Sequence, residues 1–229
     1  MNVLITGVSS GLGQSLMRSF INKGHEVYGL SRNKVDECHH ICCDLADLNS
    51  IEGKLNRLLD EVSQLDLVIL NAGILGTIKT IDHWSLDEIN EIMNINVWSN
   101  KILLDWILRN KKISLVLAIS SGASIHTYKG WSGYSLSKTA LKMLMDVYSK
   151  DTEGVQFISV APGLVSTSMQ DYLCSEVDEI KFPVTKKFIA ARKDGSMKTP
   201  VQIAEKFVEM IPQFQNLENG TFIDLRDIN

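Results

Sequence analysis

The chain lacks an excess of positive charge, and it has no apolar run long enough to span a bilayer. It carries 23 Lys and Arg against 27 Asp and Glu, a net charge of −4. A nucleic-acid or anionic-membrane surface would require a basic field over the domain. Met1 is not followed by a charged leader or a cleavable apolar segment. We therefore expect a cytoplasmic protein with neither a nucleic-acid nor a membrane partner.

Cysteine is also scarce, and its distribution excludes a disulfide framework. Of the four cysteines, three lie in the segment Cys38 to Cys43, which reads C-H-H-I-C-C, and Cys174 is distant. Thiolates and imidazoles are zinc ligands, but the chain has no second paired-ligand cluster to complete a tetrahedral site. The segment has the length of a strand. We interpret these residues as reduced thiols buried in a sheet and expect no metal site.

The chain contains no internal repeat, low-complexity tract or linker, so residues 1–229 are expected to form a single domain. Its 45% apolar and 22% charged residues are typical of a globular protein. Short apolar runs such as Val3 to Thr6 and Glu26 to Leu30 alternate with amphipathic helical segments. This order predicts an α/β fold: a Rossmann-type doubly wound parallel sheet of about seven strands with helices on both faces and ligands at the strands' carboxyl ends.

A glycine-rich turn connects the first predicted strand to the first helix. Gly7, Gly11 and Gly13 would let backbone amides approach a phosphate, and the helix N-terminus adds partial positive charge. The turn thus predicts a dinucleotide pyrophosphate site, although glycines also form purely structural turns. After the second strand, Arg32 stands near the place where an NAD-preferring site has an acidic residue. A guanidinium can form forked hydrogen bonds with a 2′-phosphate, so Arg32 favours NADP over NAD. The alternative is that Arg32 is a solvated surface residue.

Two further strand ends carry candidate cofactor contacts. Asp44 follows the third strand and could accept a hydrogen bond from an adenine amino group or cap the next helix. Asn71, Ala72 and Gly73 follow the fourth strand, where small residues would let the backbone pass close to a ribose or nicotinamide. A plain turn would have the same sequence.

A tyrosine and a lysine four residues apart form the candidate reaction centre. If the segment is helical, Tyr134 and Lys138 lie on one face, and the ammonium should lower the pKa of the phenol below its ordinary value of about 10. Ser121 follows the apolar run Ile113 to Ile119 and could bond the same substrate oxygen. Because Y-x-x-x-K is a common helical spacing, this interpretation depends on its neighbours.

A long helix is predicted from Ser85, which forms a capping box with Glu88, to about Arg109. Its apolar residues cover more than one face, which fits packing against the sheet and also against another subunit or a large neighbouring segment. Asn96 is a polar residue within this run. It either holds a water in a proton path to Lys138 or is a satisfied asparagine that bends the helix.

The periodic pattern is lost between Leu164 and Lys198, where basic residues are in excess. We expect a lid over the site, which would exclude water. The cations could favour an anionic substrate or could simply be solvated. A capped helix from Thr199 to about Met210 and a last strand from Thr221 to Leu225 follow. Candidate walls of the substrate pocket are His126, Tyr128, Trp131 and Met169.

Taken together, the motifs resemble those of the short-chain dehydrogenase/reductase family over nearly the whole chain. In order they are T-G-V-S-S-G-L-G from Thr6, D-L at Asp44, N-A-G from Asn71, Asn96, S-S-G from Ser120, Y-S-L-S-K from Tyr134 and P-G-L-V-S-T from Pro162. The segments S-S-G-A-S and K-G-W-S-G-Y are similar to the sepiapterin reductase and benzil reductase branch, whose members reduce carbonyls with NADPH.

The resemblance implies a catalytic tetrad in which Tyr134 is the general acid, Lys138 binds the nicotinamide ribose, Ser121 orients the carbonyl and Asn96 anchors a relay water. Thr167 would bond the nicotinamide carboxamide. The family is commonly dimeric or tetrameric. The implied cofactor-binding set is Gly7, Ser9, Ser10, Gly11, Leu12, Gly13, Arg32, Asp44, Leu45, Asn71, Ala72, Gly73, Tyr134, Lys138, Pro162, Gly163, Val165 and Thr167.

The expected activity is therefore the NADPH-dependent reduction of a small ketone or aldehyde, or the reverse oxidation, in a homodimer or homotetramer. A non-catalytic member that binds NADP and reports redox state to a partner is the main alternative. An epimerase or dehydratase of the same broad fold is a third possibility, but such relatives are usually longer and differ in glycine spacing.

Overall fold

The computed structural model describes residues 1–228 and contains one seven-stranded sheet with the order β3-β2-β1-β4-β5-β6-β7. Every pairing of neighbouring strands is parallel, which confirms the predicted doubly wound sheet. The strands are nearly continuous apolar runs because helices cover both faces. Their bounds are β1 (Asn2–Thr6), β2 (Glu26–Ser31), β3 (His39–Cys42), β4 (Gln64–Leu70), β5 (Lys112–Ile119), β6 (Gln156–Ala161) and β7 (Phe222–Asp224).

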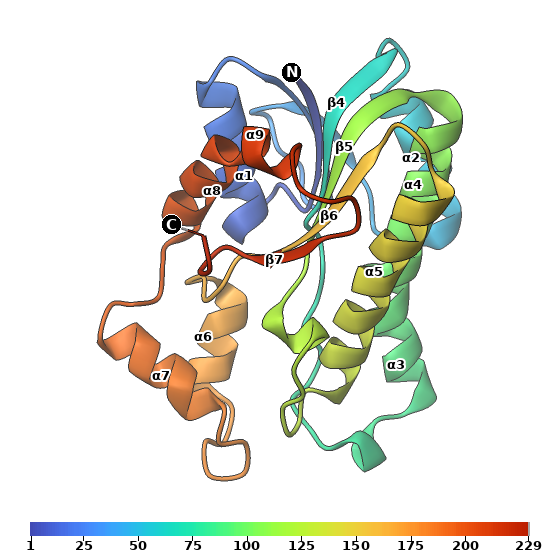
Figure 1. Cartoon of the computed structure of the whole chain (residues 1–229). Coiled ribbons are helices and arrows are strands. Elements are labelled where there is room, and N and C mark those ends of the chain that lie inside the picture. The colour runs from blue at the N-terminus through green and yellow to red at the C-terminus, as the bar shows by residue number, and fades with distance from the viewer. Residues whose placement is uncertain (229) are drawn as a thin grey trace.

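Two helical layers enclose the sheet; of the remaining helices, one packs against the second layer, and two pack against each other on the opposite side of the molecule (Figure 1). One face is covered by α1 (Gly11–Asn22), α8 (Pro200–Glu209) and α9 (Ile211–Phe214), and the other by α2 (Ile51–Leu58), α4 (Ser99–Asn110) and α5 (Ser132–Asp151). The remaining helices are α3 (Leu86–Met93), α6 (Ser168–Ser175) and α7 (Thr185–Lys193). None of the helices within residues 1–228 combines the length and the apolar character needed to cross a membrane.

Alternate residues of each strand supply the two cores. On β1, Val3 and Ile5 pack under α1 and α8, whereas Leu4 packs under α2 and α4. A third apolar cluster, which we call the lid cluster, lies beyond the strand ends and contains no sheet residue. It joins the segment 164–198 to the start of α5 and comprises Leu75, Ile78, Ile92, Ala123, Trp131, Tyr134, Leu173, Phe182 and Phe188.

Three predicted elements differ from the structure. The apolar spacing between about Asp47 and Ser63 predicts one helix, but the structure has a 3₁₀ turn at Leu48–Ser50 followed by the short α2, because the chain turns at Leu59. The segment 164–198, expected to lack regular structure, contains α6 and α7. Cys42 is exposed, whereas Cys38 is half-buried and Cys43 buried, so the expectation of buried thiols holds only in part.

The predicted helix from Ser85 to Arg109 is not uniform. It consists of α3, a five-residue π-helical turn at Asn94–Trp98, and α4. The predicted capping box is present: the Ser85 hydroxyl accepts from the Glu88 amide at 3.2 Å, and the Glu88 carboxylate accepts from the Ser85 amide at 2.9 Å. A π-helical turn inside an α-helix often marks a functional site.

Candidate active site

A cavity of about 390 Å³ runs along the carboxyl ends of the strands, beside the neighbouring strands β1 and β4, where the strand order of the sheet reverses. All the residues in the predicted cofactor-binding set line it, and so does Ser121. The volume is within the range of small-molecule sites. Of the predicted catalytic tetrad, Asn96 does not line this cavity, because it is fully buried.

The turn after β1 has the shape of a phosphate cradle. Gly7 and Gly11 have φ angles of 77° and 55°, which disfavour other residues. A Cβ atom on Gly13 would lie 2.1 Å from the Gly7 carbonyl oxygen, so only glycine fits there. The Asn71 side chain donates to the Thr6 carbonyl at 2.9 Å and thereby ties the turn after β4 to this one. The first residues of α1, Gly11 to Gly13, line this end of the cavity, and a helix N-terminus suits a pyrophosphate.

Two polar residues stand at the outer end of the cavity. Arg32 is exposed just beyond β2, and within residues 1–228 its guanidinium has no hydrogen-bond or ion-pair partner. The Asp44 carboxylate accepts from the Ala46 amide at 3.0 Å, so it caps the turn after β3 while still lining the cavity. Asp44 does not cap the next helix, since the N-cap position of the turn Leu48–Ser50 is Asp47.

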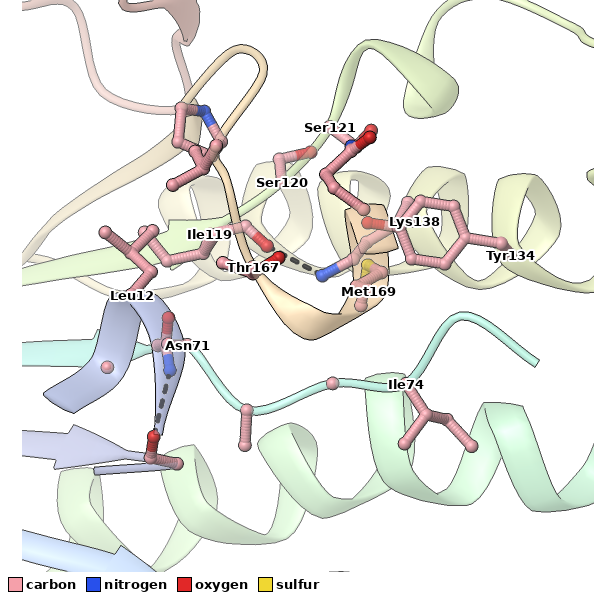
Figure 2. A pocket seen from close by; sticks show the side chains of 18 of the residues that line it. Leu12, Asn71, Ile74, Ile119, Ser120, Ser121, Tyr134, Lys138, Thr167 and Met169 are labelled. Atoms are coloured by element: carbon pink, nitrogen blue, oxygen red, sulfur yellow. Dashed lines mark hydrogen bonds between the residues drawn. The ribbon is translucent and has the colours of Figure 1, made fainter. Parts of the chain in front are cut away.

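Tyr134 and Lys138 lie in the first turns of α5 and project to one side of the cavity, with Ser121 next to them (Figure 2). The tyrosine and lysine are 8% and 4% exposed. The Lys138 ammonium donates to the Ile119 carbonyl at 2.8 Å and lies 5.7 Å from the centre of the Tyr134 ring. The Ser121 oxygen accepts from the Ala123 amide at 3.1 Å, which fixes it beside the phenol.

Burial shifts the acidity of both groups. It raises the pKa of Tyr134 to about 12, partly offset by the Ser121 hydroxyl, and it lowers the pKa of Lys138 to about 8. The prediction that Lys138 would hold the pKa of Tyr134 below about 10 is wrong for this structure, because burial disfavours the phenolate and dominates the pKa. Tyr134 is therefore a neutral phenol at neutral pH and can act as a proton donor.

Asn96 connects three segments behind the site. Its side-chain oxygen accepts from the Ile74 amide at 2.8 Å, and its side-chain nitrogen donates to the Ile74 carbonyl at 2.8 Å and to the Ser137 hydroxyl at 2.9 Å. Both amide hydrogens are thus used, as in the satisfied-asparagine alternative. A Cβ atom on Gly73 would lie 3.1 Å from the Asn96 oxygen and 3.5 Å from the Lys138 nitrogen, so a glycine separates the two side chains.

Aromatic rings form the wall next to Tyr134. The Trp131 ring stands edge-on to Tyr134 at 5.8 Å and to Tyr128 at 5.7 Å, and the Phe188 ring lies 5.5 Å from it. Tyr128, Trp131 and Met169 line the cavity as predicted. The prediction for His126 is wrong, because this residue is exposed and does not line the cavity.

The segment 164–198 covers this end of the site, as a lid would. Phe182 packs on Gly130, where a Cβ atom would lie 2.5 Å from its ring. Of the basic residues in the lid, Lys187 lines the cavity, whereas Arg192 forms an ion pair with Asp171. The sequence interpretation did not identify Phe182 or Phe188 as lid contacts; their signal was the presence of aromatic residues within a basic segment.

A second missed feature is an ion pair at the end of β7. The Asp224 carboxylate accepts two hydrogen bonds from the Arg226 guanidinium, at 2.9 and 2.6 Å, and both residues line the cavity. The Arg226 stem lies over Gly163, where a Cβ atom would be 3.1 Å away. The sequence signal that could have indicated this ion pair is the pair of opposite charges in Asp224-Leu225-Arg226, at the end of the last strand.

Comparison with known proteins agrees with this geometry. Residues 1–178 match the family model described as short chain dehydrogenase. The chain is 32% identical to the benzil reductase ((S)-benzoin forming) of Bacillus subtilis, with 98% of each chain covered. It is 25% identical to the sepiapterin reductase of Xenopus laevis, covering 98% of this chain and 95% of the relative.

The fold has close counterparts among solved structures. The short-chain dehydrogenase/reductase YIR035C of Saccharomyces cerevisiae superposes with a TM-score of 0.87 at 22% identity, covering 99% of this chain and 96% of the other. The family model spans more than half of the sequence, and the fold and the order of the motifs agree with it. The chain is therefore an oxidoreductase that belongs to the short-chain dehydrogenase family.

Proposed function

We propose that the protein is an NADPH-dependent reductase that converts a ketone or aldehyde carbonyl of a small molecule to an alcohol, or catalyses the reverse reaction, with Tyr134 as the general acid or base. The observation that carries the proposal is the buried, protonated Tyr134 phenol at the aromatic end of a cavity whose other end is a phosphate cradle. The nicotinamide supplies the hydride when bound. Gly7, Gly11 and the start of α1 would hold its phosphates.

The chain's own residues would handle the proton. The Ser121 and Tyr134 hydroxyls would hold the carbonyl oxygen, and Tyr134 would donate its proton as negative charge develops there. A phenol with a pKa of about 12 keeps its proton against water at neutral pH, yet it can protonate an alkoxide, which is a stronger base. The Lys138 ammonium would then stabilise the phenolate, and the lid would exclude water.

The aromatic wall and the relatives indicate the substrate class to test first. Two of the relatives are named as reductases of benzil and of sepiapterin. Trp131 and Phe188 offer flat apolar surface beside the proton donor. Aromatic ketones and diketones are the corresponding candidates.

The direct test is oxidation of NADPH, followed by absorbance, with diketones, quinones, aldehydes and pterins, and with NADH in parallel. Turnover of at least one carbonyl compound with NADPH is expected. Tight NADPH binding without turnover of any compound would contradict the reductase proposal and favour the redox-sensor alternative.

Replacing Arg32 with Ala is expected to weaken NADPH binding by about 10- to 100-fold, because hydrogen bonds to a charged group are worth about 1.5–3 kcal/mol. NADH lacks the 2′-phosphate, so its affinity should change by about twofold or less on the same scale. Both affinities can be measured by fluorescence titration. Arg18→Ala is the matched control, since Arg18 pairs with Glu37 away from the cavity. An equal loss for both cofactors would refute the 2′-phosphate assignment.

The affinity for NADPH is expected to fall as pH rises through about 8, where Lys138 loses its proton. Since the charged form prevails below this pKa and the neutral form above it, the loss between about pH 7 and about pH 9.5 could reach about 30-fold if only the charged form binds. Titrations across this range measure it, and Lys138→Met should remove the dependence. A flat profile for the unaltered protein would contradict a role for the lysine charge in cofactor binding.

We also propose that α5 contacts a second copy of the chain in a homodimer or homotetramer. Leu136, Met143 and Val147 are exposed apolar residues spaced along one face of this helix. Such a stripe is what a subunit interface would cover.

A further inference from the structure

A buried amide on α4 lies directly behind the candidate site and takes no part in the proposed mechanism. Asn100 is 0% exposed. Its side-chain nitrogen donates to the backbone carbonyl of Asn96 at 2.8 Å, and its side-chain oxygen has no hydrogen-bond partner within residues 1–228. A leucine of similar size would fill the same space without burying an unpaired acceptor, so packing does not account for the amide.

The carbonyl that this side chain reaches lies within the π-helical turn. In an α-helix the Asn96 carbonyl would be the acceptor for the backbone N–H of Asn100 itself. Between Asn94 and Trp98 the ladder shifts by one residue, as shown by the Ser99 amide, which bonds the Asn94 carbonyl five positions earlier. The Asn100 side chain therefore donates a hydrogen bond to a backbone carbonyl at the point where the helix departs from α geometry.

From Asn96 a chain of buried hydrogen bonds continues into the catalytic helix. The Asn96 side chain donates to the Ser137 hydroxyl at 2.9 Å, and that hydroxyl donates to the Tyr134 backbone carbonyl at 2.8 Å. Ser137 is fully buried and precedes Lys138 in the sequence. The same Asn96 side chain holds Ile74, on the opposite side of the cavity, through two bonds of 2.8 Å. The position of the Asn96 side chain therefore affects both the loop at Ile74 and the start of α5.

We propose that Asn100 is a positioning residue that holds the Asn96 carbonyl in the π-helical turn and so sets the hydrogen bonds from Asn96 to Ser137 and Ile74. Through them it fixes the first two turns of α5, which carry Tyr134 and Lys138. The effect on turnover rests on the proposed reductase function. The effect on the hydrogen bonds does not.

A matched pair of variants separates the hydrogen bond from the packing. Thr and Val are nearly equal in shape, but a threonine hydroxyl can donate to the carbonyl four residues earlier in a helix, as Ser99 does to Ile95 here at 2.7 Å. Asn100→Val should lower kcat by about 10- to 100-fold with little change in the KM for NADPH, because a small misplacement of reacting groups has such effects. Asn100→Thr should restore kcat to within about threefold of the unaltered protein on the same scale.

A control variant and a second readout complete the test. Ser99→Ala removes a similar bond in the same turn that does not involve Asn96, and it should leave kcat unchanged. Hydrogen exchange at the Ile74 amide should be faster in Asn100→Val than in Asn100→Thr, because this amide donates to Asn96. If Asn100→Val does not fold, Asn100→Ala and Asn100→Ser form the equivalent pair.

The outcomes distinguish the two proposals. If the unaltered protein reduces no carbonyl compound, the proposed function fails, and the exchange comparison still decides the role of Asn100. Equal exchange at Ile74 in the Val and Thr variants, or equal kcat in both where turnover is measurable, would overturn the positioning role. A loss of kcat in Ser99→Ala as large as that in Asn100→Val would also overturn it.

Discussion

Replacing Tyr134 with Phe is expected to reduce kcat by about 10²- to 10⁴-fold, the usual contribution of a general acid. The hydroxyl is the only group removed, and the ring, which packs edge-on against Trp131 at 5.8 Å, remains. NADPH binding should therefore be retained within a few-fold, since the phosphate cradle at the other end of the cavity is untouched. Single-turnover absorbance with the substrate found in the panel, together with fluorescence titration of NADPH, measures both quantities.

Tyr148→Phe is the matched control for this experiment. Tyr148 lies on the same helix, but its hydroxyl bonds the Asp105 carboxylate, and it does not line the cavity. Its kcat should equal that of the unaltered protein. Retained turnover in Tyr134→Phe would refute the assignment of Tyr134 as the proton donor.

Gly13→Ala should damage the protein at the opposite end of the cavity. The added methyl group would stand 2.1 Å from the Gly7 carbonyl oxygen and 2.4 Å from the Asn71 side-chain nitrogen, so the turn must move. Overpacking of this kind costs about 1–3 kcal/mol, which in a chain of this length lowers Tm by roughly 2–12 °C. Because the cradle itself is displaced, NADPH affinity should fall by about tenfold or more.

Gly53→Ala provides the comparison for the loss of a glycine as such. Gly53 lies within α2, and nothing lies within 4 Å of the place that a methyl group would take. Alanine in a helix is favoured over glycine by about 0.5–1 kcal/mol, so Tm should rise slightly and NADPH binding should not change. A Gly13→Ala protein with unaltered Tm and affinity would show that the turn is not tightly constrained.

The sheet and the cofactor-binding end could be predicted because their signals are local. Each strand is a short apolar run, and the glycines at 7, 11 and 13 lie between one such run and a helical pattern. In a parallel sheet the carboxyl ends of the strands meet at one edge. Residues as distant in sequence as Asp44 and Thr167 could therefore be assigned to one site from the strand pattern alone, and both line the cavity.

The acidity of Tyr134 could not be predicted in this way. The four-residue spacing to Lys138 was correct and both lie on α5, but spacing alone gives only the effect of a neighbouring charge. Burial decides the direction in which the Tyr134 pKa shifts. Part of that burial comes from Leu173 and Phe188 in the lid cluster, which are distant in sequence. The π-helical turn was missed for a similar reason, since the contacts of Asn96 and Asn100 depend on packing between helices.

The separation of the lid cluster from the two sheet cores has a consequence for how such a protein can diverge. Leu173, Phe182 and Phe188 contact the start of α5 and its flanking loops but no strand. Substitutions at these three positions therefore alter the shape around the substrate and leave the apolar packing of the sheet intact, because distant sites contribute to stability almost independently. Changes at these lid positions can therefore alter substrate choice, whereas Val165 and Thr167 in the same segment stay tied to the predicted cofactor site together with the turns after β1 and β2.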